Sequence, residues 1–110
     1  LFSFCCIAPT IIANKLNYFK KFDKIGSDIG LLFQISDDLI DHIGNAKKAG
    51  KKTNKDLKIG KATLIGLMGY ENTIKYSNKL KLNIYKRLNK FGKNADDLKK
   101  TINYILIRNK

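Results

Sequence analysis

Apolar residues recur along most of the chain at intervals of three and four positions, the spacing that places them on one side of an α-helix. In the second such stretch, Ile29, Leu32, Phe33 and Ile40 fall on one face. The pattern predicts five helices, over residues 1–22, 27–45, 61–69, 71–91 and 95–107. No segment sustains the alternation of apolar and polar residues that is typical of a strand. The sequence therefore predicts an all-α fold.

Glycines and polar segments indicate where the predicted helices end. Gly26 precedes Ser27 and Asp28, which have the character of a helix N-cap, so we expect a break there. Gly92 predicts a second break before the last helix. Residues 45–60 carry no sustained apolar stripe and are rich in Lys, Gly and Asn. We expect a long surface loop there, a feature that is often functional within a compact domain.

Length and cysteine content narrow the class of protein. The 110 residues suffice for one domain with a modest core. The two cysteines, Cys5 and Cys6, are adjacent and cannot form a disulfide framework, which favours a cytoplasmic location. The apolar opening is too short to cross a bilayer, so no stable membrane insertion is expected.

The chain starts at Leu1 and its single methionine is Met68, so we expect the N-terminal part of a longer protein to be missing.

The net charge of +13 belongs to one part of the chain. Residues 1–46 carry four lysines and five aspartates, whereas residues 47–110 carry eighteen basic and four acidic residues. Such a basic half favours contact with nucleic acid, an anionic membrane surface or a polyphosphate group. However, nearly all the basic residues are Lys, which a compositional bias toward Lys, Ile and Asn explains as well. A basic helical binding module therefore stays open as an alternative.

Three acids in the second predicted helix are the sharpest chemical feature. Asp37 and Asp41 are four residues apart and share a helix face, with Asp38 beside them. Two carboxylates about 6 Å apart repel by roughly 3 kcal/mol at an effective dielectric of about 20, so a positive group is expected nearby. Mg²⁺ fits, because it is commonly bound by one or two carboxylates together with substrate phosphates. The alternative is a solvated helix face paired weakly with neighbouring lysines.

An ordered series of motifs surrounds these acids. It consists of F-Q-x-x-D-D-x-x-D over residues 33–41, Gly50-Lys51, and D-x-x-x-G-K-A-T over residues 56–63. This series resembles the second aspartate-rich region of the trans-prenyl diphosphate synthases, the polyprenyl synthetase family, and is most like the bacterial farnesyl diphosphate synthases. The similarity extends over all 110 residues and includes the C-terminal sequence.

The resemblance implies a prenyltransferase of isoprenoid biosynthesis with an isoprenoid (terpenoid) synthase fold. Such enzymes condense isopentenyl diphosphate head-to-tail with an allylic diphosphate, dimethylallyl or geranyl, to give farnesyl or a related short-chain diphosphate. They use three Mg²⁺ ions and are commonly homodimers. Prenyl diphosphates are therefore the expected partners, and no nucleic acid is expected.

The resemblance also assigns roles to single residues. Asp37 matches the main metal ligand, and Asp38 and Asp41 match its supporting acids. Lys51 and Lys61 match diphosphate-binding lysines, so that Asp37, Lys51 and Lys61 form the expected catalytic set. The remaining matches are two supporting residues and a basic tail that closes over the second diphosphate: Gln34, Asp56, Arg108 and Lys110.

The 110 residues also depart from the family pattern. The first D-D-x-x-D motif, which holds the other two metal ions in the family, does not occur in them. We therefore expect the C-terminal third of such a synthase, a polyprenyl synthetase domain incomplete at its N-terminus and inactive alone. A noncatalytic subunit that docks on a catalytic partner is a further alternative.

Overall fold

The computed structural model describes residues 1–49 and 64–108, and these ranges contain helices and no strand. The α-helices are α1 (Phe2–Ile12), α2 (Phe19–Ala49), α3 (Leu64–Met68), α4 (Tyr70–Leu88) and α5 (Asp96–Ile107). Two short 3-10 helices join them, η1 (Leu16–Tyr18) and η3 (Asn89–Ala95). The all-α prediction is confirmed. Within the described ranges, no helix has the length and apolar character needed to cross a membrane.

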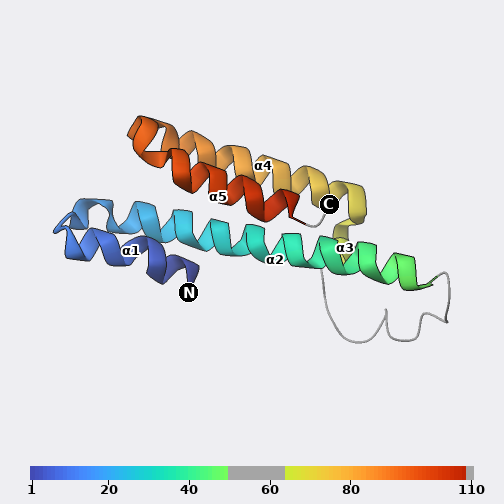
Figure 1. The fold of residues 1–110 in the computed structure, drawn as a ribbon. Coiled ribbons are helices and arrows are strands. Elements are labelled where there is room, and N and C mark those ends of the chain that lie inside the picture. Colours follow the sequence, from blue (N-terminus) through green and yellow to red (C-terminus); the bar gives the residue numbers. More distant parts are fainter. Residues whose placement is uncertain (50–63, 109–110) are drawn as a thin grey trace.

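The long helix α2 organises the molecule. Its 31 residues extend over about 46 Å. As Figure 1 shows, α1 lies along one side of its first half, and the antiparallel pair α4 and α5 lies along another side. Each of these shorter helices therefore packs on α2.

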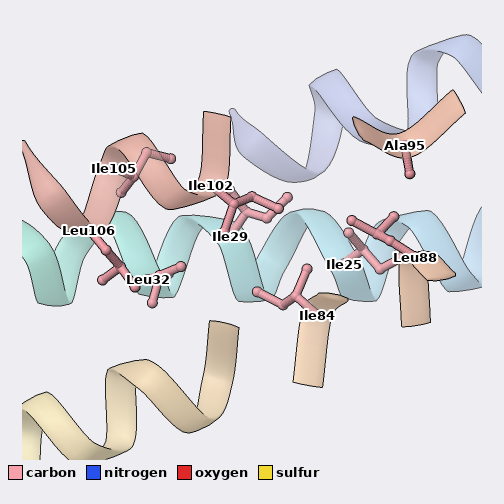
Figure 2. Close-up of a cluster of buried hydrophobic side chains, with 9 residues drawn as sticks. All are labelled: Ile25, Ile29, Leu32, Ile84, Leu88, Ala95, Ile102, Ile105 and Leu106. Atoms are coloured by element: carbon pink, nitrogen blue, oxygen red, sulfur yellow. The ribbon is translucent and has the colours of Figure 1, made fainter. Parts of the chain in front are cut away.

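The core lies between α2 and the α4–α5 pair. Figure 2 shows buried side chains converging from these elements and from the end of η3, where Ala95 lies. The nine members of the core cluster are Ile25, Ile29, Leu32, Ile84, Leu88, Ala95, Ile102, Ile105 and Leu106. Burial of their apolar surface stabilises the packing of the hairpin on α2.

The prediction of one helix over residues 1–22 is wrong, because α1 ends at Ile12. Asn14 adopts a left-handed backbone with φ of 53°, which lets the Lys15 N–H donate to the Thr10 carbonyl oxygen at 2.7 Å. The Asn14 N–H donates to the Ile11 carbonyl oxygen at 3.1 Å. Together these bonds form a Schellman-type helix end, a position that asparagine tolerates better than most residues do. The chain reverses there and α2 begins at Phe19.

Gly26 does not end a helix, and this prediction is also wrong. The residue is buried inside α2 at the crossing with α1. A β-carbon at this position would lie 2.7 Å from Ser3 Cα and 2.8 Å from the Phe2 carbonyl oxygen. Gly26 therefore permits the close approach of two helices, and Asp28 is a residue of the helix interior rather than a cap.

The remaining predicted boundaries are partly right. Helix α2 continues to Ala49, so residues 45–49 are helical rather than loop, and the rest of the predicted loop lies outside the described residues. Gly92, with φ of 59°, separates α4 from α5 as expected, although α4 ends at Leu88 rather than at the predicted residue 91 and η3 occupies residues 89–95.

The outer face of α1 is apolar and exposed. Phe4, Ile11 and Ile12 have exposed fractions of 66%, 55% and 85%, because α1 contacts α2 through its other side. Leu1 and Leu16 at its two ends are likewise exposed.

Candidate functional site

The acidic segment of α2, residues 33–41, has one buried and one solvent-facing side. Ile35, Ser36 and Leu39 are buried, on the side that continues the apolar face of the helix. The predicted site residues of this helix lie on the other side or between the two. Gln34, Asp37 and Asp41 are exposed and Asp38 is half-buried. The helical period thus produces the polar stripe that the sequence predicted.

The C-terminal end of α5 lies beside this stripe. Ser36 is buried, and its hydroxyl donates a hydrogen bond of 2.6 Å to the carbonyl oxygen of Ile105. This bond ties the last turn of α5 to the middle of the acidic segment. Arg108 directly follows α5, so the tie brings a cation to the aspartates although 71 positions separate Arg108 from Asp37.

Arg108 forms an ion pair with Asp37, in which its Nη2 donates to the Asp37 Oδ1. The guanidinium carbon lies 4.2 Å from the centre of the Phe33 ring, within the range of a cation–π contact. The exposed fractions of the two paired side chains differ, 19% for Arg108 and 51% for Asp37. The guanidinium is therefore largely enclosed, whereas the carboxylate still faces solvent.

The donor set fits a magnesium site of the kind that phosphate-bearing ligands complete. Among the side chains of residues 1–49 and 64–108, no three His, Cys, Asp or Glu groups lie close enough to hold a metal ion between them. Mg²⁺ needs fewer, because it commonly takes one or two carboxylates and fills its other positions with water and substrate phosphate. The half-exposed carboxylate of Asp37, with Asp41 one turn away, meets that requirement.

Four predicted site residues fall outside the described parts of the chain. They are Lys51, Asp56, Lys61 and Lys110. Their contribution to a diphosphate site remains a prediction from the sequence. The described residues bring together Asp37 and Arg108, with Phe33 beneath them.

His42, the single histidine, has a packing contact. Its ring stacks on that of Tyr70 with the centroids 5.1 Å apart and the planes inclined by 23°. This contact joins the second half of α2 to the start of α4. His42 therefore contributes to the packing of these two helices.

A groove of about 350 Å³ lies at the other end of the molecule. It is lined by residues of α1, η1, α2 and α5, mostly apolar, and includes Cys5, Cys6 and Lys15. Burial raises the pKa of the Cys6 thiol, with a smaller contribution from Cys5, so the thiol stays protonated at neutral pH. None of the predicted site residues lines this groove.

Two contributors to the site carried a signal that the sequence analysis did not use. Ser36 occupies a position four residues after the apolar Leu32, on the side predicted to be buried, where a hydroxyl requires a hydrogen-bond partner. Phe33 was counted with the apolar face, although it lies at the edge between the apolar and polar sides of the helix. Neither signal identifies Ile105 or Arg108 as the partner, since those contacts form only in the folded chain.

Comparison with known proteins gives one family. The sequence model of the family described as Polyprenyl synthetase matches residues 1–105. A farnesyl diphosphate synthase from Micrococcus luteus is 37% identical over 86 residues, which is 78% of this chain and 30% of that protein. A farnesyl diphosphate synthase from Escherichia coli (strain K12) is 33% identical over 91 residues, 80% of this chain and 30% of that protein.

A relative whose name gives a different product matches a similar share of this chain. A geranylgeranyl diphosphate synthase from Cyanophora paradoxa is 36% identical over 89 residues, 81% of this chain and 30% of that protein. The chain thus spans about 30% of the length of these curated relatives. No solved structure matches the chain.

Proposed function

Because this chain belongs to the polyprenyl synthetase family, we propose that it supplies the second aspartate-rich half of a magnesium-dependent prenyltransferase site. The reaction is the head-to-tail condensation of isopentenyl diphosphate with dimethylallyl or geranyl diphosphate. The product is farnesyl or a related short-chain diphosphate. The chain is the C-terminal third of the enzyme, which in its complete form is a cytoplasmic homodimer, and the chain alone does not turn over.

One observation carries the proposal: the carboxylate of Asp37 and the guanidinium of Arg108 lie together at an exposed helix face. A diphosphate headgroup bound with a divalent cation presents both signs of charge. An acid that holds the cation and a base that holds the phosphate oxygens are therefore complementary to it. Bound Mg²⁺ would stabilise the negative charge that develops on the departing diphosphate.

Each residue then has a defined task. Asp37 binds the metal ion, and Asp38 and Asp41 support it directly or through water. Arg108 binds diphosphate oxygens, as Lys51, Lys61 and Lys110 do in this proposal. Gln34 and Asp56 orient these groups through hydrogen bonds.

Calorimetric titration of the chain with geranyl diphosphate tests the proposal. Binding should require Mg²⁺, and Asp37→Ala should weaken it at least tenfold. The matched control is Asp97→Ala, which removes another exposed acid, from the first turn of α5. Equal binding with and without Mg²⁺, unchanged by Asp37→Ala, would contradict the metal assignment.

The same titration separates the proposal from a basic binding module. A module of that kind should bind a short DNA duplex or anionic vesicles with an affinity that falls steeply with salt and does not depend on Mg²⁺. The proposed function predicts that prenyl diphosphate binds in preference to either. Condensation of isopentenyl diphosphate by the chain alone would contradict the proposal that it is an incomplete site.

A further inference from the structure

Arginine is rare in this chain, and both arginines contact an aspartate of α2. The sequence has 22 basic residues, of which only Arg87 and Arg108 are arginines. Arg87 reaches from α4 to Asp28, and Arg108 reaches from the end of α5 to Asp37. The planar guanidinium suits a fixed contact with a carboxylate better than the ammonium of lysine does. The two arginines thus differ from the many lysines in being suited to a fixed contact with a carboxylate.

The Arg108 guanidinium is held by more than its ion pair. The Phe33 ring lies 4.2 Å beneath it, and the Ser36–Ile105 hydrogen bond fixes the helix end from which it extends. Its Nε is buried and has no hydrogen-bond partner in the described structure. The contact of the guanidinium with the Phe33 ring therefore does not depend on Asp37. The Nε–H donor does not depend on Asp37 either, since it makes no hydrogen bond.

The carboxylate of Asp37 is held far less firmly. Half of this side chain is exposed, and Arg108 takes only one oxygen, Oδ1, among the recorded hydrogen bonds. The loss of Arg108 costs this half-exposed carboxylate little, because water solvates the separated carboxylate almost as well. A second cation that binds Asp37 would thus displace only a weak interaction with Arg108.

We propose that Arg108 and a divalent cation are alternative partners of the Asp37 carboxylate, so that Arg108 leaves Asp37 when the cation binds and stays on Phe33. The inference rests on the proposed function, since Asp37 is its metal ligand. It adds that the metal-free site is closed by an internal ion pair. The terminal Nη2 donor that Asp37 held is then available to an oxygen of a diphosphate group.

The exchange has a consequence for affinity. Mg²⁺ alone must compete with Arg108, whereas Mg²⁺ together with a diphosphate provides Arg108 with a new partner. Removing the guanidinium should therefore strengthen the binding of Mg²⁺ alone. We expect Arg108→Gln to lower the Kd of Mg²⁺ about two- to fivefold, the range set by the small stability of an exposed ion pair.

Lys24→Gln is the matched control for this measurement. Lys24 also pairs with an aspartate of α2, with 3.2 Å between its Nζ and the Asp28 Oδ1, and its substitution removes the same unit of charge. It should leave the Kd of Mg²⁺ unchanged. Equal effects of the two substitutions would reduce the Arg108 effect to net charge and would overturn the proposal.

Nuclear magnetic resonance of the chain labelled with ¹⁵N-arginine observes the exchange directly. The two arginines give two Nε–H signals, and Arg87 is the internal reference. Titration with Mg²⁺ should shift the Arg108 signal and leave the Arg87 signal in place. In Asp37→Asn the Arg108 signal should already be shifted without Mg²⁺ and should not move further.

Two contrary results are distinguishable. If Asp37→Asn weakens Mg²⁺ binding but the Arg108 signal of the unsubstituted chain does not move on titration, the exchange is wrong and the metal assignment stands. If Asp37→Asn binds Mg²⁺ as well as the unsubstituted chain does, or neither binds it, the metal assignment of the proposed function is wrong and the exchange falls with it.

Discussion

The two halves of α2 each carry an aspartate paired with an arginine from a distant part of the chain, and the two aspartates differ in burial. In the first half, the Asp28 side chain is 10% exposed and contacts both Arg87 and Lys24. In the second half, the Asp37 side chain is 51% exposed and contacts Arg108. The same pair of residue types therefore occurs in two different surroundings on one helix.

Neighbouring elements cause the difference. Around Asp28, α2 is covered by α1 on one side and by α4 on another, and the adjacent Ile25 and Ile29 belong to the core cluster. Around Asp37, the end of α5 approaches through Ser36 and Arg108. A buried charge requires its partner, whereas an exposed charge exchanges partners at small cost. The first pair is structural, and the second is suited to binding.

Removing each arginine in turn should give the largest contrast. Arg87→Gln leaves the buried Asp28 with only Lys24, which is 70% exposed, and should lower the free energy of unfolding by about 2–4 kcal/mol. Arg108→Gln should lower it by less than about 1 kcal/mol. Urea denaturation followed by circular dichroism measures both. Equal losses would refute the distinction between the two pairs.

Two glycines of α2 provide the second contrast. Gly26→Ala places a methyl group against Ser3 and Phe2 of α1, and should destabilise the fold by about 1–3 kcal/mol because the helices must separate. Gly44→Ala meets nothing within 4 Å and should stabilise it by about 0.5–1 kcal/mol through helix propensity. Thermal denaturation should therefore shift in opposite directions. A stabilising Gly26→Ala would mean that α1 does not pack closely on α2.

The Ser36 hydroxyl provides a third test, because its hydrogen bond to the Ile105 carbonyl oxygen joins the second half of α2 to the last turn of α5. Ser36→Ala should cost about 1 kcal/mol and speed hydrogen exchange in the last turn of α5. Ser77→Ala is the control, since the equally buried Ser77 donates to Ile74 within its own helix at 2.8 Å. It should leave exchange in α5 unchanged. Equal exchange in both variants would exclude the Ser36 bond as the anchor.

The smallest expected effect concerns Tyr85, which lies in α4 two residues before Arg87. Its hydroxyl donates to the Lys99 carbonyl oxygen at 2.6 Å, and burial raises its pKa above the usual value near 10. The unfolded chain then loses this proton first, so the stabilisation from Tyr85 is complete below pH 10 and declines as the pH passes the raised pKa. Tyr85→Phe should cost about 1 kcal/mol at pH 7. A cost that is the same at pH 11 would contradict the raised pKa.

The helical content and the polar stripe of α2 could be predicted from the sequence, because both depend on local spacing. Apolar residues three and four positions apart select a helix, and the same period places Asp37 and Asp41 on its exposed side. The break at Gly92 was predicted for a similar reason, since a positive φ is a local requirement that glycine meets without strain. These features need no partner element.

The boundary errors have the opposite origin. Nothing in the local sequence indicates that Gly26 lies inside a helix. The need for glycine at this position comes from Ser3 and Phe2, which only the reversal at Asn14 brings near. Asparagine at position 14 is only a weak local signal for a helix end. A glycine at a helix crossing and a glycine at a helix end are alike in sequence.

What the sequence determined by itself is the chemistry available on α2: an amphipathic helix with carboxylates at one-turn spacing, in a motif series that marks its family. What only the tertiary structure decided is which charge each carboxylate meets. The arginine partners of Asp28 and Asp37 come from 59 and 71 positions away. Contacts across such distances depend on the packing of α4 and α5 around a shared core, which local spacing does not encode.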